Sequence, residues 1–139
     1  MTFKIGSLCY LDLTANSALS HIEQPLIHKI CRLYNVFGSG ASHGIYAQFM
    51  EQSREHNNGR AIGLLRGAGT RMASWFYAMH RALRLRGALM STIHQAKFAT
   101  IGLVKTDNRV RECVQDINDP QFWKSIYQLL RAVFPALRA

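Results

Sequence analysis

The chain has 139 residues, the size of one ordinary domain, with 48% hydrophobic residues, 18% charged residues and a formal net charge of +9. This balance is typical of a globular protein and excludes a disordered chain. No apolar run approaches the roughly 20 residues that span a bilayer, and the first residues do not match a secretory signal. Neither a transmembrane helix nor a secreted protein is therefore expected.

The first helical pattern covers residues 25–37. Pro25 suits the first helical turn, where its missing N–H costs nothing, and Gly38 is a suitable stop. The apolar residues that repeat between them at intervals of three and four are Leu26, Ile30, Leu33 and Phe37. This spacing predicts a helix with one buried face.

A second helix is predicted from Ser42, which is a good N-cap residue. Its inner side carries Ile45 and Phe49, which lie one turn apart. The sequence His-Asn-Asn-Gly at residues 56–59 predicts the loop that ends this helix, because Asn and Gly favour turns.

The longest periodic segment covers residues 69–94 and predicts one long amphipathic helix. Its apolar sector holds Met72, Trp75, Phe76, Met79, Ala82, Leu83, Leu89, Met90 and Ile93. Its opposite side holds Ser74, Tyr77, Arg81, Arg84 and Ala88. Arg81 and Arg84 lie one turn apart, so we expect them to project together into solvent. Arg86 falls in the apolar sector beside Gly87, which leaves a bend, a buried partner or a side chain that extends to solvent as alternatives.

Residues 95–108 are weakly patterned and end in a turn at residues 106–108. A short helix is predicted over residues 109–117. Asp119 and Pro120 then give the clearest helix start in the chain, because an N-cap residue is followed by a proline in the first turn.

The last helix is interrupted by Pro135. No segment alternates with period two, except that Phe3, Ile5 and Leu8 could begin a strand near the N-terminus. No internal repeat or long linker divides the chain. The sequence therefore predicts a single all-α domain over residues 1–139, with about five to six helices.

The net charge of the chain is concentrated in residues 60–111. This window holds ten of the 17 Lys and Arg residues and one carboxylate, Asp107, whereas the residues on either side of it balance in charge. A concentrated positive field attracts polyanions, and the aromatic residues 75–77 can stack on bases or fill a core. Nucleic acid is therefore the first partner class, ahead of an acidic protein or a membrane surface. A solvated basic helix face is the alternative.

No motif for catalysis, cofactor binding or metal binding is found in the sequence. The three cysteines and six histidines are scattered, which argues against a disulfide framework and a zinc site. Glu112 and Asp116 have a spacing suited to joint metal binding, but we interpret them as an exposed pair. The glycine-containing residues 67–70 match no nucleotide-binding motif, although with Arg71 they are a candidate phosphate cradle. No catalytic residue, metal or cofactor is therefore expected.

Two stretches of the chain resemble a known family. Residues 70–89 are similar to the motif T-R-(W/F)-x-S … M-x-x-R-x-L-x-L-(K/R)-x-A-L. Residues 117–126, with the downstream Leu129, Leu130 and Pro135, are similar to the motif I-x-D-x-x-F-W-x-x-I … L … P. Both motifs belong to the helical insertion domain of hAT-type DNA transposases and their BED-finger relatives. The resemblance covers residues 66–137.

This resemblance implies a transposon-derived, DNA-associated nuclear protein. In the family, the Arg and the aromatic residue of T-R-W approach DNA; Arg71 matches the Arg, but Met72 occupies the aromatic position and cannot supply a stacking face. The Asp-Asp-Glu triad of family members and its α/β fold are not found, so we expect a catalytically incomplete module rather than an enzyme. Without the resemblance, a cytoplasmic protein is the default.

The function predicted from the sequence is a DNA-associated helical module that contacts the phosphate backbone, with hairpin ends as a further target. The residues predicted to bind nucleic acid are Arg66, Arg71, Met72, Arg81, Arg84 and Lys97. No membrane and no small-molecule substrate is expected as a partner. The alternatives are a protein-interaction or homo-oligomerisation module, a non-functional relic of a hAT transposase, and a fragment of a longer active transposase.

Overall fold

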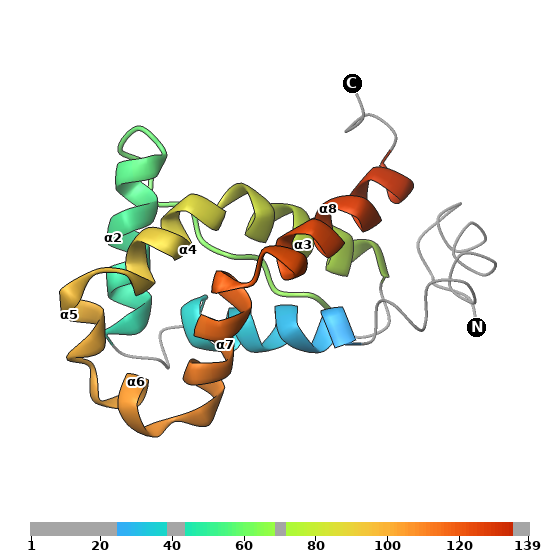
Figure 1. Cartoon of the computed structure of the whole chain (residues 1–139). Helices are drawn as coiled ribbons and strands as arrows, with labels where there is room; N and C mark the ends of the chain where they lie inside the picture. Colours follow the sequence, from blue (N-terminus) through green and yellow to red (C-terminus); the bar gives the residue numbers. More distant parts are fainter. Residues whose placement is uncertain (1–24, 39–43, 69–71, 135–139) are drawn as a thin grey trace.

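The computed structural model describes residues 25–38, 44–68 and 72–134 (Figure 1). These ranges contain eight helices and no strand, so the prediction of an all-α protein is confirmed. The first helix spans residues 25–37 and is drawn in blue in Figure 1. The others are α2 (Ile45–His56), α3 (Met72–Arg84), α4 (Arg86–Ile93), α5 (Ala96–Ala99), α6 (Gly102–Thr106), α7 (Asn108–Asn118) and α8 (Pro120–Val133). The alternative strand near Phe3 lies outside the described residues.

The helix over residues 25–37 ends where its sequence predicts, just before Gly38, and its predicted start at Pro25 coincides with the first described residue. Its predicted buried residues Leu26, Ile30, Leu33 and Phe37 are all buried. The Phe37 ring stacks on the Phe98 ring of α5, with centroids 6.1 Å apart, and meets the Phe49 ring of α2 edge-on. This helix therefore supplies one wall of the hydrophobic core.

The second helix, α2, begins at Ile45 and ends at His56, as its predicted terminal loop requires. Its N-cap is Gly44, so the prediction of Ser42 as the cap is wrong. Buried Ser53 holds the chain that follows the loop, because its hydroxyl donates to the Ile62 carbonyl at 2.6 Å and accepts from the Ile62 N–H at 2.8 Å. This pair of hydrogen bonds ties the extended residues 60–68 to α2.

Residues 69–94 do not form one continuous helix, because the chain breaks at Leu85 into α3 and α4; this agrees with the bend that the sequence left open beside Arg86. The apolar sector changes at the break: Ala88, which the single-helix pattern placed in solvent, is buried with Leu85 and Leu89. The break lets α4 turn a different face towards α2, against which it packs. Arg86 is exposed, and its guanidinium lies 5.5 Å from the centroid of the Trp123 ring.

The weakly patterned residues after α4 form two short helices, α5 and α6, which together with the break raise the helix count above five or six. The next two helices have aspartate caps. Asp107 accepts a hydrogen bond from the Arg109 N–H at the start of α7, and Asp119 accepts one from the Gln121 N–H at the start of α8. The predicted start of the last helix is therefore confirmed. It ends at Val133, and Pro135 lies outside the described residues.

The long helices pack in pairs around one core (Figure 1). Helix α4 packs on α2 and α7, while α3 packs on α8. The Phe134 ring at the end of α8 meets the Phe76 ring near the start of α3, whereas Arg86, just after α3, reaches Trp123 near the start of α8. Helices α3 and α8 therefore run antiparallel. In the part of the chain that the structure describes, no helix is long and apolar enough to cross a membrane.

Candidate nucleic-acid interface

Helix α3 is largely enclosed and exposes one narrow stripe. Its exposed residues are Tyr77, His80 and Arg84, which follow one another at intervals of three and four. This spacing places them on one face of a helix. The Tyr77 side chain is 58% exposed, a high value for a large aromatic residue on an otherwise covered helix.

Helix α8 exposes a second stripe with the same spacing. Lys124, Tyr127 and Arg131 are all exposed, and the Arg131 guanidinium lies 5.5 Å from the centroid of the Tyr127 ring. The buried side of α8 is formed by Phe122, Trp123, Ile126, Leu129 and Leu130. The stripe therefore lies along the edge of a helix whose other side fills the core.

The two stripes border the same seam. Tyr77 meets Phe134 at one end of the α3/α8 pair, with ring centroids 5.9 Å apart, and Arg86 meets Trp123 at the other. Both helices are right-handed, and they run antiparallel to each other. On each helix, the exposed stripe therefore lies next to the residues that contact the other helix, on the side away from the core. We call this combined area the α3/α8 surface; it consists of Tyr77, His80, Arg84, Lys124, Tyr127 and Arg131.

The α3/α8 surface is positive and carries no carboxylate of its own. Neither α3 nor α8 contains an Asp or Glu residue; Asp119, the cap of α8, lies just before its first residue. Arg84 and Lys124 form no ion pair within the part of the chain that the structure describes. The arrangement therefore combines exposed aromatic rings with Arg84 and Lys124, two cations that form no ion pair in the described ranges.

Cations elsewhere in the described chain are often paired with carboxylates. The Lys97 ammonium lies 3.1 Å from the Glu51 carboxylate, and the Arg109 guanidinium lies 3.3 Å from that of Asp107. Hydrogen bonds from the Arg109 side chain and backbone hold the pKa of Asp107 below its usual value. These pairs reduce the positive potential that the sequence assigns to the middle of the chain.

The expectation that Glu112 and Asp116 form an exposed pair holds for Glu112 but is wrong for Asp116. Both face the 25–37 helix, where the Arg32 guanidinium lies 2.8 Å from Asp116 and 3.7 Å from Glu112. Asp116 is half-buried because of this packing, and the Lys29 ammonium adds a contact at 3.8 Å. No group of three or more potential metal ligands occurs among the residues described.

The expectation that Arg81 and Arg84 project together into solvent is also wrong. Arg84 is exposed on the α3/α8 surface, but half-buried Arg81 points away from it and donates a hydrogen bond to the Gly63 carbonyl at 2.8 Å. An apolar pattern could not reveal this, because the acceptor is a backbone group 18 residues earlier. Arg81 secures the extended residues 60–68 to α3.

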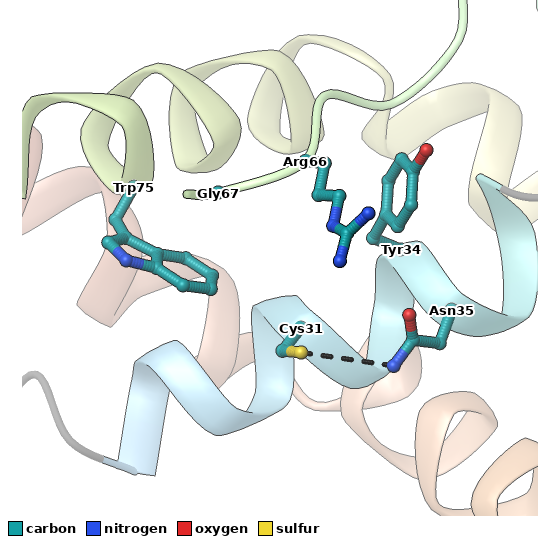
Figure 2. Close-up of a pocket in the computed structure, with 6 residues that line it drawn as sticks. All are labelled: Cys31, Tyr34, Asn35, Arg66, Gly67 and Trp75. Carbon is teal, nitrogen blue, oxygen red and sulfur yellow. Dashed lines mark hydrogen bonds between the residues drawn. The ribbon is translucent and has the colours of Figure 1, made fainter. Parts of the chain in front are cut away.

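The other predicted binding residues are dispersed. Arg66 is exposed on residues 60–68 and lines a pocket beside Trp75 (Figure 2), whereas Lys97 lies on α5 against Glu51. Met72 is the first residue of α3, and only its backbone is described; Arg71 lies outside the described residues. The phosphate cradle expected at residues 67–70 also falls partly outside them.

Sequence reasoning missed most of the α3/α8 surface. It noted Tyr77 and Arg84, but His80, Lys124, Tyr127 and Arg131 were assigned no role. A signal was present, since Lys124, Tyr127 and Arg131 have helical spacing and the two helix sequences lack carboxylates. What the sequence lacked was the antiparallel pairing that places the two stripes side by side.

Comparison of the chain with models of known protein families, with curated proteins and with solved structures found no match.

Proposed function

We propose that the protein binds nucleic acid through the α3/α8 surface. The observation that supports the proposal is the pairing of two exposed stripes, each containing an aromatic residue and at least one cation, on helices without a carboxylate. Phosphate contacts by such cations release counterions from DNA, which drives binding of low sequence specificity. The partner class is therefore DNA bound through its phosphate backbone, with hairpin ends as a further target.

The aromatic residues give the surface a second means of binding. The side chain of Tyr77 is 58% exposed and that of Tyr127 is 42% exposed. Exposed rings on a basic surface can stack on accessible bases, and their hydroxyls can bond to phosphate oxygens. Unpaired ends and hairpin loops offer more accessible bases than a duplex. We therefore expect a hairpin to bind more tightly than a blunt duplex.

Self-association through this surface is the competing function. The exposed tyrosines favour it, because aromatic rings are common in protein interfaces. The charges oppose it, since a two-fold contact would bring the cations Arg84 and Lys124 towards the same positive surface of a second copy. A polyanion removes this repulsion, and the nucleic-acid proposal is the stronger one for that reason.

The proposal is tested by removing the three cations of the surface together. We expect the triple variant Arg84→Gln, Lys124→Gln, Arg131→Gln to bind a labelled DNA duplex and a labelled hairpin about a hundredfold or more weaker at 100 mM salt, because about three phosphate contacts are lost. Fluorescence anisotropy measures both affinities, and circular dichroism checks that the variant keeps its helices.

A matched control variant has the same net charge as the triple variant. Arg54, Arg60 and Lys105 are exposed cations on other parts of the described chain. Changing these three to Gln removes the same formal charge, and we expect less than about a fivefold loss of affinity, from the weaker long-range field alone. Equal losses in the two triple variants would show diffuse charge attraction and contradict a defined surface.

Descent from a hAT transposase, as a catalytically incomplete module, is part of the same proposal. It is supported by the order of the two motifs within residues 66–137. Because Met72 stands where the family motif has an aromatic residue, other aromatic residues would have to stack on the bases. Tyr77 and Tyr127 are exposed and can do so. An open reading frame that encodes the acidic triad on the full transcript would identify the chain as part of an active enzyme instead.

A further inference from the structure

A separate pocket lies between the 25–37 helix, the extended residues 60–68 and the start of α3 (Figure 2). Its volume is about 250 Å³, and it is lined by Cys31, Tyr34, Asn35, Arg66, Gly67 and Trp75. Ligand pockets usually measure about 300–1,000 Å³, so this one suits a molecule smaller than a drug. Residues of the 25–37 helix form one wall, and the later residues Arg66, Gly67 and Trp75 form the rest.

The position of Gly67 shapes one end of the pocket. A Cβ atom at this residue would lie 2.2 Å from Cε3 of Trp75, so only glycine lets the chain approach the indole this closely. One face of the Trp75 ring is thus covered by backbone, and Figure 2 shows an edge of the ring turned towards the space below Arg66. The pocket therefore offers a ring edge at this wall.

The Arg66 guanidinium points into the pocket. Figure 2 shows it between Trp75 and Tyr34, above Cys31 and Asn35 of the 25–37 helix. Arg66 forms no ion pair with any residue in the described ranges. A guanidinium presents paired N–H donors that match a carboxylate or a phosphate.

Below Arg66, the floor of the pocket is polar. The Asn35 amide nitrogen donates to Cys31 Sγ at 3.8 Å, which orients both side chains along the wall of the 25–37 helix. Aromatic edges favour the face of another ring, in the edge-to-face arrangement. The Arg66 guanidinium can thus bind an anionic group, and the adjacent space beside the aromatic walls can hold one planar ring.

We infer that this pocket binds a small organic anion, namely a carboxylate or phosphate attached to a single planar ring. Arg66 binds the acidic group, and the ring lies on the Trp75 side of the guanidinium, against the edge of the indole. The site is distinct from the α3/α8 surface, since Trp75 lies on the opposite side of α3 from Tyr77, and it does not depend on the proposed function. It departs from the expectation that the chain takes no small-molecule ligand.

Cys31 allows the inference to be tested, because it is exposed and lies on the pocket wall. Cys113 does not interfere: it is buried, and burial raises the pKa of its thiol to about 12, so almost no thiolate is present near pH 7.5. A Cys9→Ser background removes the third thiol. The rate of Cys31 alkylation by iodoacetamide, followed by mass spectrometry, then reports whether the pocket is occupied.

Phenyl phosphate and benzoate are the probes, and benzyl alcohol is the neutral ring control. At about ten times its Kd, a bound probe should slow the alkylation of Cys31 about tenfold. Whichever acid protects at the lower concentration identifies the acidic group. Benzyl alcohol should not protect. Unchanged alkylation at millimolar concentrations of both acids, or equal protection by benzyl alcohol, would overturn the inference.

Variants at Arg66 and Arg60 test whether the protection of Cys31 arises from binding in this pocket. Arg66→Gln should raise the Kd of the protecting acid about tenfold or more, because a charged hydrogen-bond donor is lost. Arg60→Gln, on the same extended segment but outside the pocket lining, should keep full protection. The triple variant of the α3/α8 surface should also keep it, which separates this site from DNA binding. Protection that survives Arg66→Gln would contradict the role of Arg66.

Discussion

Arg81 and Arg84 illustrate how two arginines one turn apart acquire different roles. Arg81 is half-buried and donates to the Gly63 carbonyl at 2.8 Å, whereas Arg84 is exposed. A hydrogen bond from a charged donor to a half-buried carbonyl stabilises the fold, while an isolated surface charge contributes little. Arg81 therefore stabilises the fold, whereas Arg84 is available for contacts at the surface.

We expect Arg81→Ala to lower the free energy of unfolding by about 1–3 kcal/mol, because the Gly63 carbonyl loses its donor and the extended residues 60–68 lose an anchor. Arg84→Ala is the matched control and should stay within about 0.5 kcal/mol of the parent. Urea unfolding of both variants measures the difference. Equal stabilities would mean that the Arg81 hydrogen bond contributes nothing to the fold.

At the scale of elements, helix caps were easier to predict than helix continuity. The cap of α8 could be read directly, because Asp119 and Pro120 satisfy local rules of backbone geometry. The break between α3 and α4 was indicated only by Arg86, which interrupts the apolar sector beside Gly87, because residues 69–94 otherwise keep a helical period. The buried positions of Leu85 and Ala88 are decided by packing against other helices, which no local pattern contains.

The cap of α7 should make part of the stability dependent on pH. The pKa of Asp107 is lower in the folded protein than its usual value, because it bonds to the Arg109 side chain and backbone. A carboxyl group with a depressed folded pKa stabilises the fold above its unfolded pKa, near 3.9, and this stabilisation is lost as the pH falls through the folded pKa.

We therefore expect wild type to be more stable than Asp107→Asn at pH 7, with a difference that shrinks below about pH 4 and vanishes as Asp107 becomes protonated. Asparagine keeps the capping geometry, so the comparison isolates the charge. Thermal unfolding between pH 7 and pH 2 measures the difference. A gap that stays constant down to pH 2 would show that the charge of Asp107 plays no part.

At the scale of the whole molecule, charge was predictable and its distribution was not. The sequence shows that residues 60–111 are basic, but pairs such as Lys97 with Glu51 form only when α5 and α2 meet. The α3/α8 surface likewise depends on two helices about 40 residues apart in sequence. Composition therefore led to the proposed class of partner, and tertiary packing was needed to locate a surface for it.

The central claim, that the α3/α8 surface binds the phosphate backbone, is tested most directly by the salt dependence of DNA affinity. Each phosphate contact contributes a slope of about −0.9 to log K against log salt, so the triple Gln variant at Arg84, Lys124 and Arg131 should show a slope shallower by about 2.7 than wild type. The control variant at Arg54, Arg60 and Lys105 should keep the wild-type slope. Identical slopes for wild type and both variants, measured from 50 to 300 mM salt, would contradict the claim.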